Sequence, residues 1–297
     1  MKLEKNVKLS ELTTIGLGGS AKFLARCKSA ADIKEALGFA GRNKLEVFVL
    51  AGGSNVVFPD KGFGGLVLKV ELGGIEFDDK GEYAEAAVAA GEDWDKFVLQ
   101  CANKGLGGIE CLSGIPGTAG ATPIQNVGAY GQEVSETILA VRALDMETGE
   151  MVEFSNADCG FSYRASRFKK EDLGRFIILE VVFKLSKDGE PALRYPELKS
   201  LSEEKGINEF SRGKQALLAV RKAVFELRKK KSMILDPKDP NTRSCGSFFT
   251  NPTRLIATMG YMRIRAHQQS WQGSNPYPGT KNTPSLRFSM GSPKLLK

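Results

Sequence analysis

The segment from Ser113 to Gly131 constrains the fold of this chain more than any other stretch. It reads S-G-I-P-G-T-A-G-A-T-P-I-Q-N-V-G-A-Y-G, which is rich in glycine, holds two prolines and carries no formal charge. Glycine and proline both oppose helical backbone, so this sequence excludes a helix here. Its apolar side chains need a surface to pack on, which favours a buried loop over a disordered linker.

Glycine lets backbone N–H groups approach an anion closely, so such a loop suits the phosphates of a cofactor. The alternative is an irregular connection within an all-β region. A second donor-rich turn, Gly52 to Phe58 with the sequence G-G-S-N-V-V-F, comes directly after an apolar run and again suits a pyrophosphate.

The length of 297 residues indicates two or three domains. We expect units at 1–70, 71–192 and 193–297, the last atypical after about 253. No run approaches the roughly 18 apolar residues of a membrane span, and residues 1–10 lack the apolar core of a signal peptide. Five scattered cysteines and one histidine, His267, argue against a metal site or a disulfide framework and favour a reducing cytoplasm.

The formal net charge of +7 is concentrated at one end of the chain. Residues 240–297 contain eight Lys or Arg and no Asp or Glu, so they carry +8 and leave −1 for residues 1–239. A nearly neutral body is not typical of a nucleic-acid-binding fold, so we expect no nucleic-acid partner.

The first unit has the pattern of a small β-α-β fold. Ser29 is suited to cap a helix over 30–43, and strands are expected at 46–51 and 66–70. The glycines at 16–21 formally fit the dinucleotide pattern G-x-G-x-x-A. We reject that interpretation because no apolar strand precedes them and no acidic strand end follows.

The second and third units alternate strands and helices. Strands are expected at 84–90, 138–145, 150–154 and 176–185, with a helix from Asp93 whose apolar stripe we interpret as core packing. A helix over 214–230 ends in Arg228 to Lys231, which on residue type alone is a solvated, dipole-stabilising helix end. The alternation indicates an α+β sheet.

Six segments, in order, resemble UDP-N-acetylenolpyruvoylglucosamine reductases, the flavoenzymes that complete UDP-N-acetylmuramate. They are G-G-S-N-V-V-F, the loop 113–131, F-S-Y-R-A-S-R-F-K, R-Y-P-E-L, R-K-K-K-S-M-I-L-D-P and C-G-S-F-F-T-N-P. The Arg194-Tyr195 segment is similar to the type I form of that family. The resemblance implies a two-part FAD-binding domain of the vanillyl-alcohol-oxidase type, followed by a smaller α+β substrate-binding domain.

The same resemblance implies residue roles. Arg164 would stabilise an enolate and Ser247 would donate a proton, although a turn hydroxyl is the simpler interpretation of a serine in that position. The substrate UDP-N-acetylglucosamine enolpyruvate would contact Tyr163, Tyr195, Arg228, Lys231 and Asn251. FAD would contact Gly52, Gly53, Ser54, Asn55, Val56, Gly114, Ile115, Pro116, Gly117, Thr122, Pro123, Ile124, Asn126, Gly128 and Tyr130. NADPH would supply the hydride, and we expect a cytoplasmic monomer, without metal or membrane insertion, that serves peptidoglycan biosynthesis.

After Pro252 the resemblance fades. The family has a catalytic glutamate near its C-terminus, and this chain has no acidic residue after Asp239. We therefore expect an incomplete substrate-binding domain with a truncated or frame-shifted end. The alternatives are a divergent functional extension, an impaired flavin-binding remnant, a related FAD oxidoreductase with another substrate, and a nucleic-acid binder that uses the basic tail.

Overall fold

The N-terminal part forms a four-stranded sheet. The computed structural model describes residues 1–208 and 210–247. In this sheet the order is β1-β2-β4-β3, with β2 and β3 parallel to β4 and β1 antiparallel to β2. The strands are β1 Lys2–Lys8, β2 Ser20–Cys27, β3 Val47–Leu50 and β4 Phe63–Val70.

Helix α1, Ala30–Arg42, connects β2 to β3 and confirms the predicted cap. The Ser29 hydroxyl accepts a hydrogen bond from Asp32 N at 3.1 Å, and Ser29 N donates to the Asp32 carboxylate at 3.1 Å. This reciprocal arrangement satisfies two N–H groups that would otherwise lack partners. Ile33, Ala36 and Ala40 bury one face of the helix. The helix and the two strands predicted between residues 30 and 70 are therefore present.

A five-stranded antiparallel sheet forms the second layer, in the order β10-β9-β11-β6-β5. Its strands are β5 Ile75–Asp79, β6 Tyr83–Ala89, β9 Ile138–Asp145, β10 Met151–Ser155 and β11 Phe176–Ser186. Helix α2, Trp94–Asn103, packs on it, and the four residues of its predicted apolar stripe are all buried. One hydrophobic core runs through both sheets, so the first 186 residues form one packed body.

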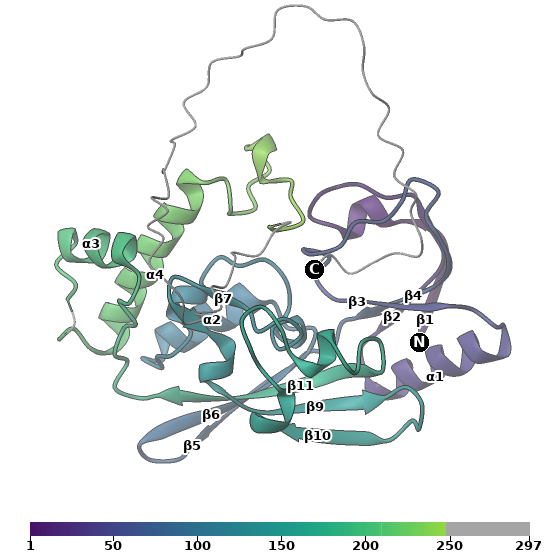
Figure 1. Cartoon of the computed structure of the whole chain (residues 1–297), viewed down its shortest axis with the longest axis horizontal. Helices are drawn as coiled ribbons and strands as arrows, with labels where there is room; N and C mark the ends of the chain where they lie inside the picture. Colours follow the sequence, from purple (N-terminus) through teal and green to yellow (C-terminus); the bar gives the residue numbers. More distant parts are fainter. Residues whose placement is uncertain (209, 248–297) are drawn as a thin grey trace, which may run out of the picture.

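Two helices, α3 Pro196–Glu204 and α4 Gly213–Lys230, pack on each other beyond the second sheet. Their buried side chains form a separate small cluster with Cys111. In Figure 1 these helices lie on the side opposite the four-stranded sheet, and the β7 hairpin of the glycine-rich loop lies between them. The loop is therefore placed where all three parts of the chain meet.

The glycine-rich loop contains more regular structure than predicted. A single 3-10 turn covers Ala119–Ala121, and a short ladder pairs β7 Gly128–Ala129 with β8 Gln132–Glu133. The expectation of no helical backbone was wrong for these three residues, which lie between the helix-opposing Gly117 and Pro123. The remaining 3-10 turns are η1 Leu9–Leu12, η2 Glu110–Leu112, η4 Val134–Glu136, η5 Ala157–Cys159, η6 Arg167–Lys169 and η7 Pro240–Thr242.

Besides the short strands β7 and β8, four strands and helices were not predicted from the sequence: β1, β2, β5 and α3. Strand β1 is an edge strand of alternating Lys or Glu and aliphatic residues, and most of its side chains are exposed or half-buried. Such a pattern carries little hydrophobic signal. No helix in the described part of the chain is both long and apolar enough to cross a membrane.

Candidate functional site

The turn after β3 packs directly on the glycine-rich loop. A Cβ atom added to Gly52 would lie 2.5 Å from Gly117 Cα, and the Ser54 hydroxyl donates to Pro116 O at 3.0 Å. Gly53 has φ +70°, and a Cβ there would lie 1.9 Å from Leu12 O. The two segments therefore approach backbone to backbone, which only glycine permits.

The first N–H groups of this turn have no acceptor among the described residues. Within the described residues, no hydrogen bond is donated by the backbone N–H groups of Gly52, Gly53, Ser54 and Asn55. Thr118 Oγ1 in the facing loop is likewise buried without a partner among the described residues. Consecutive free N–H groups beside an unpaired hydroxyl form a ready-made cradle for an anion.

The end of the loop is a tight hairpin with two residues in left-handed backbone. Tyr130 and Gly131 have φ of +50° and +80° between the paired residues Ala129 and Gln132. Two positive φ values match the turn that suits the twist of a hairpin, but a tyrosine there is uncommon. The turn carries Tyr130 toward α3, where its ring meets that of Tyr195 edge-on at 5.5 Å between centroids.

Arg164 occupies a second strained turn beside this hairpin. Ser162 and Ala165 exchange two backbone hydrogen bonds of 3.0 Å around it, and Arg164 has φ +54°. Its guanidinium donates to Gly128 O at 2.6 Å and to Asn126 O at 3.4 Å. Non-glycine residues in this conformation cluster at functional sites, where surrounding contacts hold the strain.

A lysine and a glutamine connect Arg164 to the turn after β3. Lys169 Nζ donates to Arg164 O and to Gln125 Oε1, both at 3.2 Å, and the same amide oxygen accepts from Asn55 Nδ2 at 3.2 Å. Burial, with a smaller contribution from Arg164, lowers the pKa of Lys169. These contacts tie the two glycine-rich segments to the arginine turn.

The C-terminal end of α4 brings Arg228 to the start of the loop and Lys231 to α3. Arg228 is only 8% exposed, and a Cβ on Gly114 would lie 3.3 Å from its Nε, which has no partner among the described residues. Burial lowers the pKa of Arg228. Lys231 is exposed and pairs with Glu197 at 2.8 Å, which raises its pKa. For Arg228 the interpretation as a solvated helix end was therefore wrong.

Tyr130 lies in the field of both cations. Burial is the main influence and raises the pKa of its phenol, while Arg228 and Lys231 act in the opposite direction. The phenol stays neutral at physiological pH and can both donate and accept a hydrogen bond. Tyr163 and Tyr195 are partly exposed, at 39% and 40%.

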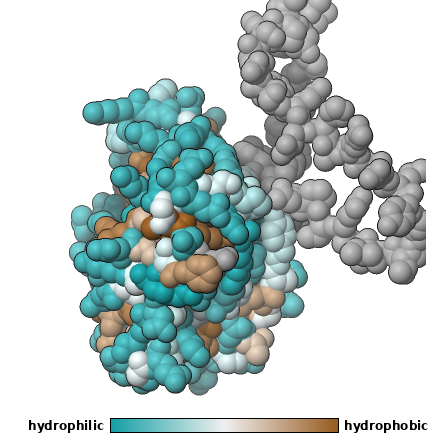
Figure 2. Space-filling model, turned by 90° about the vertical axis from the view of Figure 1, so that its left-hand side faces the viewer, coloured by the Kyte–Doolittle hydropathy of each residue, from teal (hydrophilic) through white to brown (hydrophobic). Residues whose placement is uncertain are grey.

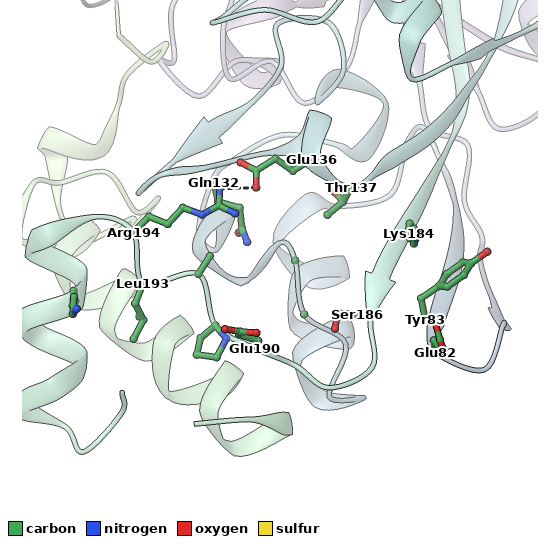
Figure 3. Close-up of a pocket in the computed structure, with 15 residues that line it drawn as sticks. Glu82, Tyr83, Gln132, Glu136, Thr137, Lys184, Ser186, Glu190, Leu193 and Arg194 are labelled. Atoms are coloured by element: carbon green, nitrogen blue, oxygen red, sulfur yellow. Dashed lines mark hydrogen bonds and ion pairs between the residues drawn. The ribbon is translucent and has the colours of Figure 1, made fainter. Parts of the chain in front are cut away.

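A surface groove of the described chain lies elsewhere. Its volume is about 760 Å³, and it runs along the 190–194 connection and the ends of β6 and β11 (Figure 3). Arg194 points across it toward Glu136, with which it forms an ion pair of 2.7 Å. None of the site residues predicted from the sequence lines this groove. We therefore locate the candidate site at the glycine-rich loop and not at the groove.

Comparison with known proteins agrees with this location. The family profile described as "FAD binding domain" matches residues 21–155. A UDP-N-acetylenolpyruvoylglucosamine reductase from Thermobifida fusca is 45% identical over 253 residues, which are 84% of this chain and 68% of that protein. The same reductase from Salinispora arenicola is 42% identical over 277 residues, 93% of this chain and 74% of that protein. The chain belongs to the UDP-N-acetylenolpyruvoylglucosamine reductase family.

A solved reductase of this family has the same fold. The crystal structure of UDP-N-acetylenolpyruvylglucosamine reductase from Thermus caldophilus matches with a TM-score of 0.61 and 26% identity, over 85% of this chain and 76% of that one. The predicted family and the α+β fold with an FAD-binding domain of the vanillyl-alcohol-oxidase type are therefore confirmed. The chain is an FAD oxidoreductase of the reductase type.

The hydrogen-bond donors of the turn after β3 and of the facing loop fit the phosphates of FAD. The free N–H groups at 52–55 and the unpaired Thr118 hydroxyl suit a pyrophosphate, and the contact of Gly52 with Gly117 leaves room only for backbone. The loop 113–131 has no charged side chain, and all of it except Gly131 is buried or half-buried. Among the described residues, no group of three or more His, Cys, Asp or Glu side chains could hold a metal ion.

The segment that carries Ser247 returns to the first unit. Thr14 Oγ1 donates to Ser244 O at 2.5 Å, and a Cβ on Gly246 would lie 3.5 Å from Asn55 Oδ1. Ser247 is exposed immediately after this contact. The fold thus brings the predicted serine close to the turn after β3. Asn251 lies outside the described residues.

The structure gathers most of the predicted site residues and adds others that the sequence did not reveal. Gln125, Glu133 and Lys169 connect the predicted residues to one another, and all three lie in or next to segments shared with the reductases. Asp95 is different. It accepts from Gly114 N and from Arg221, 126 positions further along the chain, and no local pattern indicates such a pair.

Proposed function

We propose that this chain reduces the enolpyruvyl ether of UDP-N-acetylglucosamine enolpyruvate to UDP-N-acetylmuramate, with FAD as cofactor and NADPH as hydride donor. The reaction belongs to peptidoglycan biosynthesis. One observation carries the proposal: cations lie at both ends of a single neutral FAD loop. Arg164 lies on the carbonyls at 126 and 128, and Arg228 lies against Gly114.

That spacing of charge suits a substrate with two anionic ends. Arg228 and Lys231, with Tyr130 and Tyr195 beside them, would hold the diphosphate, because a buried guanidinium with an unpaired Nε needs an anionic acceptor. Arg164 would meet the carboxylate of the enolpyruvyl group, since its planar fork matches a carboxylate. Tyr163, whose ring lies 5.1 Å from the guanidinium carbon of Arg164, would complete that end.

FAD, when bound, supplies the hydride that it has taken from NADPH. Hydride addition to the terminal alkene carbon leaves negative charge on the carbon next to the carboxylate. Arg164 stabilises this charge from a position that the fold has already fixed. Ser247, at the edge of the cradle, supplies the proton to that carbon, which is a strong enough base to accept it from a hydroxyl. Thr122, Pro123 and Ile124 shape the loop between these groups.

Purified protein tests the proposal. We expect a yellow protein with bound FAD that oxidises NADPH only when the enolpyruvyl sugar nucleotide is added. Oxidation of NADPH at the same rate without this substrate would contradict the proposed substrate.

A flavin-binding protein without turnover is the second candidate. The observation that favours it is the absence of any acidic residue after Asp239. Bound FAD with no substrate-dependent NADPH oxidation would support it over the reductase reaction. The free, buried cysteines of the described chain agree with a cytoplasmic location, which we propose for either function.

A further inference from the structure

Glu133 lies next to Arg164 and has no role in the reaction proposed above. It pairs with Gly128 across the β7–β8 ladder, and its Oε1 lies 3.8 Å from Arg164 Nη1. A Cβ added to Gly128 would lie 2.8 Å from both Arg164 Nη1 and Glu133 Cγ. The missing side chain of Gly128 therefore leaves the space in which the carboxylate and the guanidinium come together.

The carboxylate of Glu133 is held on its other side as well. Its Oε2 accepts from Asn126 Nδ2 at 2.7 Å, and Asn126 Oδ1 accepts from Ser135 N at 3.1 Å. Asn126 is 1% exposed and has φ +45°, so its own position is fixed by the loop. A carboxylate with one oxygen anchored on a buried amide is a rigid partner for an arginine.

Without this partner Arg164 would have fewer constraints. Arginine is a long side chain with many rotamers, and Glu133 adds a charged contact at Nη1 to the two hydrogen bonds that the guanidinium makes to loop carbonyls. The nearby Lys169 donates to the backbone oxygen of Arg164, so that contact holds the turn and not the guanidinium. Among the described residues, Glu133 is the carboxylate that pairs with Arg164.

We propose that Glu133 is a positioning residue that fixes the Arg164 guanidinium in the orientation needed to stabilise the enolate. This inference rests on the proposed function. Its negative charge also offsets part of the attraction between Arg164 and the substrate carboxylate. Removal of the charge should therefore slow the step that needs Arg164 and should not weaken substrate binding.

The variant Glu133→Gln tests this directly, because glutamine keeps the shape and an acceptor for Asn126. We expect reoxidation of the reduced flavin by the enolpyruvyl substrate to slow by about 10-fold or more, as expected when a catalytic group is misplaced. Reduction by NADPH should stay within about 2-fold, and KM should not rise. Glu136→Gln is the matched control, since Glu136 lies in the same turn but pairs with Arg194.

Equal rates in Glu133→Gln and the wild type would overturn the proposal. So would a joint loss of FAD affinity and of both half-reactions, which would indicate a purely structural role. If the wild type binds FAD but the substrate never reoxidises the reduced flavin, the proposed function fails. A second measurement then decides whether Glu133 holds the Arg164 guanidinium. That measurement is the rate at which phenylglyoxal modifies Arg164, followed by peptide mass spectrometry.

Phenylglyoxal reacts with guanidinium groups that are free to move. We expect Glu133→Gln to speed modification of Arg164 several-fold and to leave Arg175, which pairs with Asp145 at 2.8 Å, unchanged. An unchanged rate at Arg164 would show that Glu133 does not hold the guanidinium, whether or not the protein turns over.

Discussion

Arg164 shows how a single residue can be recognised as functional from its backbone. An arginine at φ +54° is strained, and its guanidinium is anchored on two carbonyls of the glycine-rich loop that we propose to hold FAD. An arginine with no role beyond the surface would not require a strained backbone or two carbonyl contacts. The strain is tolerated because the Ser162–Ala165 turn and the hairpin enclose it.

Arg164→Lys keeps the positive charge and removes the planar fork. We expect the rate of flavin reoxidation by substrate to fall by about 10²–10³, the loss typical of one electrostatic group in an active site. Reduction by NADPH should change little, and stopped-flow absorbance of the flavin measures both steps. A parallel fall in both rates would contradict a role confined to the enolate.

Gly52 is the residue whose substitution tests the cradle. In Gly52→Ala the new methyl group would lie 2.5 Å from Gly117 Cα, so the two segments must separate and FAD binding should be lost. Gly41→Ala in α1 is the control, because a Cβ there meets nothing within 4 Å and should slightly stabilise the helix. Fluorescence titration with FAD reports both affinities. Normal affinity in Gly52→Ala would show that the close approach is not required.

At the scale of elements, α2 and α4 are joined by one charged pair. Arg221 donates to both oxygens of Asp95, at 2.7 and 2.6 Å, and Asp95 also accepts from Gly114 N. The pair therefore connects the helix that carries Arg228 to the start of the FAD loop. Arg221 is 9% exposed, so its charge has little access to solvent.

We expect Arg221→Met to lower the free energy of unfolding by about 2–3 kcal/mol, the value of hydrogen bonds to a charged group. Arg142→Met is the control, since Arg142 forms its ion pairs with Glu153 and Glu180 on the surface, where such pairs contribute less than about 1 kcal/mol each. Urea unfolding measures both variants. Equal losses of unfolding free energy in the two variants would mean that the buried pair is no stronger than the surface pair.

The end of the β9–β10 hairpin should respond to acid. Arg175, followed by a backbone hydrogen bond from Glu147, holds the pKa of Asp145 below its ordinary value. The pair therefore stabilises the fold above the ordinary carboxyl pKa of about 4, and this contribution is lost as pH falls through the lowered value. Asp145→Asn should have a lower Tm at neutral pH and a flatter decline below about pH 4 than the wild type. The exposed Glu171→Gln should follow the wild-type curve.

At the scale of the whole molecule, all five cysteines are free and buried. Burial raises the pKa of Cys27 and Cys159 to about 12 and also raises the pKa of Cys101 and Cys111. We expect no reaction with a thiol reagent at neutral pH in the folded protein and five reactive thiols in denaturant, because the thiolate is the reactive form. Rapid labelling of any cysteine in the folded chain would show that its surroundings open.

Sequence-based prediction was accurate for features that depend on residues close together in the chain, and it failed for those that depend on distant residues. The Ser29 cap and the apolar stripe of α2 depend on residues a few positions apart, and both were predicted correctly. The exposed face around α3 and α4 carries mixed hydrophilic and hydrophobic side chains (Figure 2). Such a mixture gives no clear apolar stripe in the sequence, and α3 was not predicted. Motifs shared with the reductases led to the cradle residues. Glu133 and Asp95 were missed because their roles depend on partners that only the folded chain brings near.

The hydrogen bond from Thr14 to Ser244 joins positions 230 residues apart. During synthesis the N-terminus leaves the ribosome first, so the first unit can fold long before Ser244 emerges. The turn at residues 52–55 can therefore form on a nascent chain before Ser247, the proposed proton donor, has been made. Flavin could bind early in synthesis. The proposed reaction can occur only once residues 244–247 have folded back onto the first unit.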